Sequence, residues 1–232
     1  MNYENIGQMI KIKIDEYGEN RALRYKENDL WKSLSYKEFG EKITKLGCAL
    51  IKAGIEKGDT VGIYSANRYE WAVSDFACIL VGAISVPIYA TNTKDQAKFI
   101  VQDAKIKLVF AGSEVQYKNL ASIHLEGIPL KIVTYEAGLS IDPSFASTFQ
   151  EFMNASDLDE YITELNQRSG QIKRDDVSTV IYTSGTTGNP KGVMLSHGNL
   201  FHQFEAVDVN FNVTSADTSL CFLPLSHVYE RM

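Results

Sequence analysis

Residues 182–192, YTSGTTGNPKG, are the part of the sequence best suited to chemistry. They hold three glycines, four Ser or Thr hydroxyls, one proline and one lysine. Glycines allow backbone N–H groups to turn toward an anion, hydroxyls add hydrogen-bond donors, and lysine adds a point charge. Directly before this stretch, residues 177–182 are rich in β-branched and aromatic side chains, which predicts a buried strand. The pattern therefore predicts a phosphate-handling loop at the end of a strand.

Two common nucleotide-binding patterns do not fit this loop. The P-loop pattern GxxxxGK[ST] places a hydroxyl residue after the lysine, whereas Gly192 follows Lys191 here, and the spacing from Gly185 also differs. No G-x-G-x-x-G dinucleotide fingerprint occurs in the chain. A surface turn that happens to be rich in Gly and Thr is the remaining simple explanation. Ordinary turns do not need this concentration of hydroxyls with a proline and a lysine, so we favour a phosphate loop.

The composition is that of an ordinary globular protein. The chain has 232 residues, enough for one large domain or two small ones, and 44% of them are apolar. The formal net charge is −6, from 23 basic and 29 acidic side chains. Because no long basic patch is available to neutralise a phosphate backbone, nucleic acid is not expected as a partner. A local Lys or Arg site for one small anion remains compatible with this charge.

The cysteines and the apolar runs indicate a cytoplasmic protein. Cys48, Cys78 and Cys221 are far apart, each in an apolar context, which predicts buried free thiols in a reducing compartment. Charges are scattered through the first twenty residues, so no signal peptide is expected. The longest apolar run, residues 76–90, spans 15 residues and is interrupted by Gly, Ser and Pro. A transmembrane helix needs about 20 apolar residues, so no transmembrane segment is expected.

Hydrophobic periodicity predicts an α/β fold with mixed, partly parallel sheets flanked by helices. Helices are expected at residues 6–17, 35–54, 68–81, 94–104, 114–123 and 198–207, the second opened by a capping box at Ser35 and Glu38. Strands are expected at residues 22–25, 30–34, 60–64, 84–89, 107–111, 130–135, 177–182 and 218–223. Residues 136–174 are polar and are expected to form a surface excursion with one short helix around Phe149.

With these motifs in view, the sequence resembles the adenylate-forming (AMP-binding) enzymes, which include acyl-CoA synthetases, peptide-synthetase adenylation domains and luciferases. YTSGTTGNPKG is similar to the signature loop of that family, and the similarity continues through residues 193–200. Upstream, residues 67–71 and 82–89 also resemble its N-terminal half. Within the family, residues 222–231, FLPLSHVYER, are most similar to long-chain fatty-acid–CoA ligases.

The resemblance implies a ligase that uses ATP, Mg²⁺ and coenzyme A. Such enzymes activate a carboxylate at the α-phosphate of MgATP, release pyrophosphate, and pass the acyl group from AMP to a thiol. The implied small-molecule partners are a fatty acid, ATP and coenzyme A, and a lipid substrate would suit a peripheral contact with a membrane. The implied fold is the N-terminal portion of the large domain of an acyl-CoA synthetase.

The resemblance also assigns roles to residues of the loop. The hydroxyls of Thr183, Ser184, Thr186 and Thr187 would donate hydrogen bonds to the pyrophosphate end of ATP, with backbone N–H groups near Gly185 and Gly188 as further donors. Lys191 would add positive charge at the phosphates or would brace the loop.

Outside the loop, His227 is the candidate catalytic residue, because the resemblance puts it near the acyl and adenylate pocket. A histidine packed at a strand end explains it equally well. Glu230 and Arg231 are explained by a surface ion pair, and His197 by the start of the helix that follows the loop. Two aromatic residues, Tyr69 and Trp71, are expected in the core.

Several features of the family do not occur in this sequence. The Tyr-Gly-x-Thr-Glu signature, whose glutamate serves Mg²⁺, is missing, as are the ribose-binding aspartate and the small C-terminal domain with its catalytic lysine. No metal ligand is therefore assigned. We expect an N-terminal fragment, with an α/β portion at residues 1–174 and the strand, loop, helix and strand at residues 175–232, that is inactive alone. An aryl- or amino-acid-activating ligase and a standalone nucleotide- or phosphate-binding module remain as alternatives.

Overall fold

A seven-stranded sheet forms the centre of the molecule in this computed structural model, which describes residues 3–183, 190–211 and 214–231. The strand order is β7-β6-β5-β3-β4-β8-β9, and every neighbouring pair is parallel except β8 and β9. These strands are β3 (Thr60–Tyr64), β4 (Ile84–Ile88), β5 (Leu108–Ala111), β6 (Lys131–Thr134), β7 (Ala146–Thr148), β8 (Val177–Thr183) and β9 (Lys191–Ser196). The predicted mixed α/β class is confirmed, and the sheet includes strands from both sides of residue 174.

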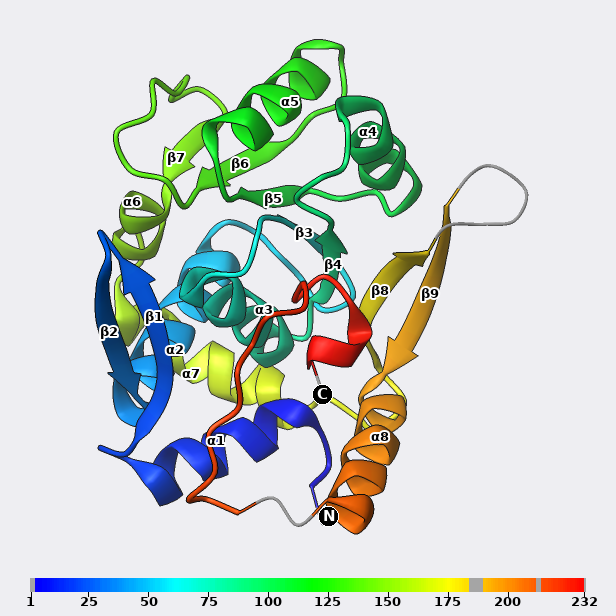
Figure 1. Cartoon of the computed structure of the whole chain (residues 1–232). Coiled ribbons are helices and arrows are strands. Elements are labelled where there is room, and N and C mark those ends of the chain that lie inside the picture. Colours follow the sequence, from blue (N-terminus) through cyan, green and yellow to red (C-terminus); the bar gives the residue numbers. More distant parts are fainter. Residues whose placement is uncertain (1–2, 184–189, 212–213, 232) are drawn as a thin grey trace.

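Helices cover the two faces of this sheet unequally (Figure 1). On one side of the sheet, α1, α2, α3, α6 and α7 contribute to one core cluster, and on the other side α4 and α5 contribute to a second. The helices are α1 (Ile6–Tyr17), α2 (Tyr36–Lys52), α3 (Tyr69–Val81), α4 (Lys94–Asp103), α5 (Glu114–Leu125), α6 (Phe149–Asn154), α7 (Leu158–Gly170) and α8 (His197–Asn210), with a short 3-10 helix η1 (Val228–Arg231). A separate antiparallel hairpin consists of β1 (Arg21–Glu27) and β2 (Leu30–Ser35).

Side-chain caps fix where several helices begin. The predicted capping box of α2 is present, because the Ser35 side chain accepts from the Glu38 N–H while the Glu38 carboxylate accepts from the Ser35 N–H. The same reciprocal arrangement opens α4, α6 and α8. Each box satisfies two backbone donors that a helix start leaves unpaired, so these boundaries follow directly from the local sequence.

The polar excursion at residues 136–174 contains more structure than its sequence predicted. The expected short helix at Phe149 is α6, but the edge strand β7 and the thirteen-residue helix α7 were not predicted. The helix α7 buries little apolar surface of its own, mainly Leu165, which packs closely against Gly47 of α2. A Cβ at residue 47 would lie 3.0 Å from Leu165 Cδ1, so this glycine allows the close approach of the two helices.

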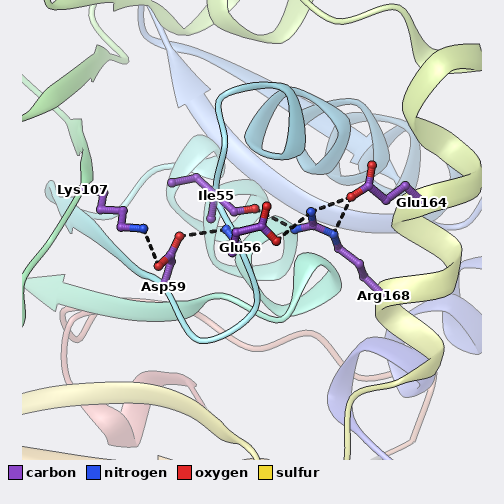
Figure 2. A network of polar contacts seen from close by, with 6 residues as sticks. All are labelled: Ile55, Glu56, Asp59, Lys107, Glu164 and Arg168. Carbon is purple, nitrogen blue, oxygen red and sulfur yellow. Dashed lines mark hydrogen bonds and ion pairs between the residues drawn. The ribbon is translucent and has the colours of Figure 1, made fainter.

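A polar network holds α7 against the amino-terminal edge of the sheet (Figure 2). Arg168 of α7 pairs with Glu56 at 3.0 Å, in the loop between α2 and β3. In that loop, Asp59 accepts from the Glu56 N–H at 2.8 Å and pairs with Lys107, which precedes β5, at 2.7 Å. The network joins three segments that are far apart in the sequence, and it lies at the end of the strands opposite to the candidate site.

The strand expected at residues 218–223 does not form. These residues have no ladder partner among the described strands, and Leu220 and Phe222 are exposed by 75% and 74%. Their short apolar run before Pro224 is typical of a strand, but a strand also requires a neighbour to pair with. Because this segment does not join the sheet, Cys221 is exposed and the prediction that it is buried is wrong. Cys48 and Cys78 are buried as predicted.

Candidate functional site

At the carboxyl-terminal edge of the sheet, the chain leaves the neighbouring strands β3 and β4 toward opposite faces, which makes this point a topological switch. The chain leaves β3 for α3 on one face and leaves β4 for α4 on the other, as the two separate core clusters show. In open α/β sheets, ligands bind in the crevice that such a switch creates outside the carboxyl ends of the strands. Since β8 is parallel to β4, its carboxyl end at Thr183 lies at the same edge.

The predicted phosphate loop connects β8 to β9 at this edge. Thr183 ends β8 and pairs across the antiparallel hairpin with Lys191, the first residue of β9, and both side chains are exposed. The remaining predicted phosphate-binding residues lie outside the described residues: Ser184, Gly185, Thr186, Thr187 and Gly188. The loop is thus anchored by a hairpin at the edge where ligands bind, and its phosphate contacts stay predictions.

The base of this hairpin is closely packed around Tyr182. A Cβ at Gly192, its cross-strand partner, would lie 2.9 Å from Val180 Cγ1 and 3.1 Å from Tyr182 Cζ, so the ring requires a glycine there. The Tyr182 hydroxyl donates to Asp103 Oδ2 of α4 at 2.6 Å. Burial and the nearby Asp103 carboxylate raise the pKa of Tyr182, so the phenol stays a hydrogen-bond donor at neutral pH.

Lys191 is available for a ligand. Its side chain makes no hydrogen bond or ion pair with the part of the chain that the structure describes. An exposed ammonium at the mouth of the loop can contact a phosphate as a point charge. The alternative role, bracing of the loop, would involve residues outside the described set, so both roles remain open.

A second segment, residues 223–231, lies across the same edge and is held by Asn67 from the loop after β3. The Asn67 Nδ2 donates to the Leu223 carbonyl at 2.6 Å, and the Leu225 N–H donates to Asn67 Oδ1 at 2.8 Å. Next to it, Arg68 forms a forked pair with Glu70 at 2.8 Å and donates to the Gly112 carbonyl at 3.0 Å. These bonds fix the loop after β3 and, through it, the 223–231 segment.

His227 lies in the turn of this segment and is exposed. Its N–H donates to the Pro224 carbonyl at 2.8 Å, and its Nδ1 accepts from the Tyr229 N–H at 3.2 Å. With Nδ1 occupied as an acceptor, the neutral ring carries its proton on Nε2 and can offer that N–H to a ligand. The alternative interpretation, a histidine packed at a strand end, is wrong because no strand forms here. The catalytic role stays a prediction.

Arg231 is not part of a surface ion pair, contrary to the sequence interpretation. Its side chain is only 6% exposed and pairs with Asp75 of α3 at 2.5 Å, whereas Glu230 accepts from the Leu223 N–H at 3.2 Å. The available signal was Asp75 itself, a carboxylate in a mostly apolar helix, which needs a partner when buried. Its partner is 156 residues away, so the sequence could not identify it.

His197 is structural, as expected for the start of α8. It is 2% exposed, and its Nδ1 accepts from the Ile6 N–H at the start of α1 at 3.3 Å. Burial lowers the pKa of His197 to about 4. The two aromatics of α3 also lie in the core as predicted, since Trp71 is 1% exposed and Tyr69 is partly buried against the same cluster.

The described residues contain no cluster of three or more His, Cys, Asp or Glu side chains placed to hold a metal ion. In this part of the chain, the acidic and other metal-ligating side chains thus do not assemble a Mg²⁺ site. Within the described ranges, no helix has both the length and the apolar character to span a bilayer.

A cavity of about 1290 Å³ lies away from these residues. It is lined by segments at the amino-terminal edge of the sheet, among them Ile106, Leu130 and Phe145. None of the predicted site residues lines it. Because ligands of parallel sheets bind at the opposite edge, we assign the candidate site to the carboxyl-terminal edge rather than to this cavity.

Comparison with known proteins identifies clear relatives. The family model described as "AMP-binding enzyme" matches residues 11–232. The peroxisomal long-chain acyl-CoA synthetase 6 of Arabidopsis thaliana is 37% identical over 203 residues, which cover 87% of this chain and 29% of that protein. A long-chain-fatty-acid–CoA ligase of Homo sapiens is 33% identical over 232 residues, which cover 98% of this chain and 34% of that protein. The chain thus spans about a third of the length of these curated relatives.

Solved structures share the fold. A fatty acyl-CoA synthetase of Mycobacterium tuberculosis has a TM-score of 0.79 at 22% identity, covering 98% of this chain and 41% of that chain. An anthranilate–CoA ligase in complex with anthranoyl-AMP has a TM-score of 0.76 at 22% identity, covering 90% of this chain and 38% of that chain. At such identity the likeness shows the fold alone.

Proposed function

This chain belongs to the AMP-binding enzyme family, and from that premise we propose that it carries the ATP-phosphate loop of a ligase that converts a fatty acid to its coenzyme A thioester. The observation that carries the proposal is the YTSGTTGNPKG stretch at the carboxyl end of β8, beside the switch between β3 and β4. The two curated relatives described above are named as a long-chain acyl-CoA synthetase and a long-chain-fatty-acid–CoA ligase, which supports a fatty acid as the acyl substrate.

The proposed reaction has two steps. In the first, a fatty-acid carboxylate oxygen attacks the α-phosphorus of ATP, the bond to the β-phosphate oxygen breaks, and pyrophosphate leaves with its electron pair. In the second, the coenzyme A thiolate attacks the acyl carbon, AMP leaves, and the thiol proton passes to solvent. Both partners of the first step are anionic, so catalysis depends on positioning and on compensation of negative charge.

Residues of the candidate site would divide this work. Thr183 and the hydroxyls and N–H groups that follow it would hold the departing pyrophosphate, with Lys191 compensating charge. Each hydrogen bond to a charged phosphate contributes roughly 1.5–3 kcal/mol. His227, with Nδ1 occupied, would offer its Nε2–H to an acyl or phosphate oxygen at the same edge.

Experiment can distinguish the fatty-acid ligase from two alternative functions. An aryl- or amino-acid-activating ligase would use the same loop, and an anthranilate–CoA ligase indeed shares the fold. A standalone nucleotide- or phosphate-binding module would use the loop for binding only. The fatty-acid ligase is favoured because residues 222–231 resemble that subgroup and because the curated relatives carry that name.

We also propose that the 232-residue chain is inactive alone and that turnover belongs to a longer polypeptide that contains it. The sequence lacks the glutamate and lysine signatures that the family resemblance requires, and it matches about a third of its curated relatives. The cytoplasm is the proposed location. A peripheral contact with a membrane finds no support in the described residues, so we leave it out of the proposal.

The direct test is a panel of carboxylic acids offered to the longer polypeptide with MgATP and coenzyme A. We expect thioester formation, measured by mass spectrometry, with long-chain fatty acids. Thioesters formed only from aryl acids, or adenylates formed only from amino acids, would replace the fatty-acid assignment. Binding of ATP without any carboxylate-dependent cleavage would favour the binding module.

A further inference from the structure

Among the described residues, the seam between β4 and β8 has the fewest backbone register pairs of the central sheet. These neighbouring strands share one backbone register pair, Ser85 with Thr179, whereas β3 shares five pairs with β4 and four with β5. Beyond Thr179, residues 180–183 pair only with β9, so the hairpin projects from the sheet as a two-stranded ribbon (Figure 1). A two-stranded ribbon is marginally stable by itself, so its direction depends on its junction with β4 and on the contact of Tyr182 with Asp103 of α4.

Arg231 bridges the two strands at this single pair. Its Nη1 donates to Thr179 Oγ1 of β8 at 2.8 Å, and its Nη2 donates to Ser85 Oγ of β4 at 3.1 Å. The Thr179 hydroxyl in turn donates to the Ser85 carbonyl at 2.8 Å. One side chain from the 223–231 segment therefore closes a polar cluster across the seam.

The third partner of Arg231 fixes its orientation. Nη2 also pairs with Asp75 of α3 at 2.5 Å, and the guanidinium lies over the Trp71 ring, 5.4 Å from its centroid. Thr179 and Ser85 are fully buried, and Asp75 is 10% exposed, so water cannot replace these bonds. A planar fork with five donors can satisfy all of them at once, which the ammonium of lysine cannot.

We propose that Arg231 is a positioning residue for the phosphate loop. By joining β4, β8 and α3 it sets the direction of the β8–β9 hairpin, and hence of the loop that begins at Thr183. Since Arg231 belongs to the same segment as His227, it also fixes this segment relative to the loop. The positioning itself rests on the contacts described; its consequence for ATP rests on the proposed ligase function.

Two variants of the seam test the proposal. Arg231→Lys keeps the charge near Asp75 but cannot bridge Thr179 and Ser85 together. The double variant Arg231→Met with Asp75→Asn removes the bridge without leaving a buried carboxylate unpaired, which keeps the test valid if the single variant folds poorly. In both, we expect hydrogen exchange of the amides of β8 and β9 to become at least about tenfold faster, while exchange in β5 and β6 is unchanged.

Arg168→Lys is the matched control. Arg168 is also a poorly exposed arginine, at 15%, that joins distant segments, but it acts at the opposite edge of the sheet (Figure 2). Its variant should accelerate exchange near residues 55–59 and 164–170 and leave β8 and β9 unchanged. Equal exchange of β8 in wild type and Arg231→Lys would overturn the proposal. Exchange that becomes faster to the same extent in all strands would also overturn the proposal, because it would indicate a general loss of stability.

The same variants in the longer polypeptide separate this inference from the proposed function. If both hold, Arg231→Lys raises the KM for ATP about tenfold with little change in the KM for the carboxylic acid, whereas Arg168→Lys changes neither. A protein without ATP-dependent activity that still shows faster exchange in β8 supports the seam and contradicts the ligase. An active ligase whose KM for ATP is unaffected by Arg231→Lys overturns the positioning role.

Discussion

At the scale of single residues, the candidate site contains an exposed lysine, Lys191, and a buried arginine, Arg231. Lys191 has no partner in the described part of the chain, which is the state expected of a side chain that waits for a phosphate. Arg231, by contrast, is buried and is held by three protein groups. Burial thus distinguishes the two cations, since Lys191 is exposed and the Arg231 side chain is only 6% exposed.

The variant Lys191→Ala, made in the longer polypeptide, tests whether Lys191 contacts the phosphates of ATP. Loss of one charge-assisted contact to the pyrophosphate should slow adenylate formation by about 10- to 100-fold and thioester formation far less. Rapid-quench single turnovers measure the two steps separately. Lys118→Ala, an exposed lysine on α5 paired only with Glu114, is the control and should change neither step. Equal slowing of both steps by Lys191→Ala would indicate a bracing role instead.

Because burial lowers the pKa of His197, we expect the free energy of unfolding to depend on pH. Its pKa is about 4 in the folded chain, against about 6.5 when exposed, so folding favours the neutral ring. The stability it contributes is therefore fully present above pH 6.5 and is lost as pH falls toward 4, about 3 kcal/mol in total. The groups whose charges affect it are Asp176, Lys57 and Asp75.

Urea denaturation at pH 7.5 and pH 5.5 measures this effect. We expect the free energy of unfolding to fall by about 1 kcal/mol between these pH values in the wild type. In His197→Gln the decrease should be much smaller, because glutamine does not titrate and can still accept from the Ile6 N–H. The same decrease in both proteins would show that another group is responsible.

At the scale of elements, sequence patterns predicted what local chemistry determines. The strands β3 to β6 are short apolar runs between helices of clear periodicity, and the capping box at Ser35 fixed the start of α2. The helix α7 was missed because few of its side chains are buried. Residues 218–223 were assigned to a strand wrongly, because a short apolar run alone does not supply a pairing partner.

The candidate site was predictable from the sequence only in part, because some of its contacts join segments that are far apart in the chain. The composition of residues 182–192 indicated phosphate chemistry because every contribution lies within one short stretch. The clamp by Asn67 and the buried pair of Asp75 with Arg231 depend on contacts between segments more than 150 residues apart. Nothing in the local sequence of either partner specifies the other, so only the structure could reveal them.

Gly192→Ala tests the hairpin as an element. The new Cβ would lie 2.9 Å from Val180 Cγ1 and 3.1 Å from the Tyr182 ring, so β9 must shift away from β8. We expect a loss of about 1–3 kcal/mol in the free energy of unfolding, measured by urea denaturation, and weaker ATP binding. Gly170→Ala is the control, since nothing lies within 4 Å of its Cβ, and it should be neutral or stabilising by up to about 1 kcal/mol. Equal effects would contradict the role assigned to Gly192.

At the scale of the whole molecule, the chain presents one edge of a parallel sheet on which two distant segments converge. The phosphate loop extends from β8, and residues 223–231 lie across the loop after β3. The polar network around Arg168 stabilises the opposite edge and contributes nothing to this convergence (Figure 2). The polar network and the candidate site therefore lie at opposite edges of the sheet, and parallel α/β sheets bind their ligands at the carboxyl-terminal edge.

The ligase proposal is tested most directly by following which bond of ATP breaks. The longer polypeptide is incubated with MgATP, a long-chain fatty acid and labelled pyrophosphate, without coenzyme A. We predict that label enters ATP only when the fatty acid is present, because attack at the α-phosphate is reversible and releases pyrophosphate. Cleavage to ADP and phosphate, or the absence of fatty-acid-dependent exchange, would contradict an adenylate-forming fatty-acid ligase.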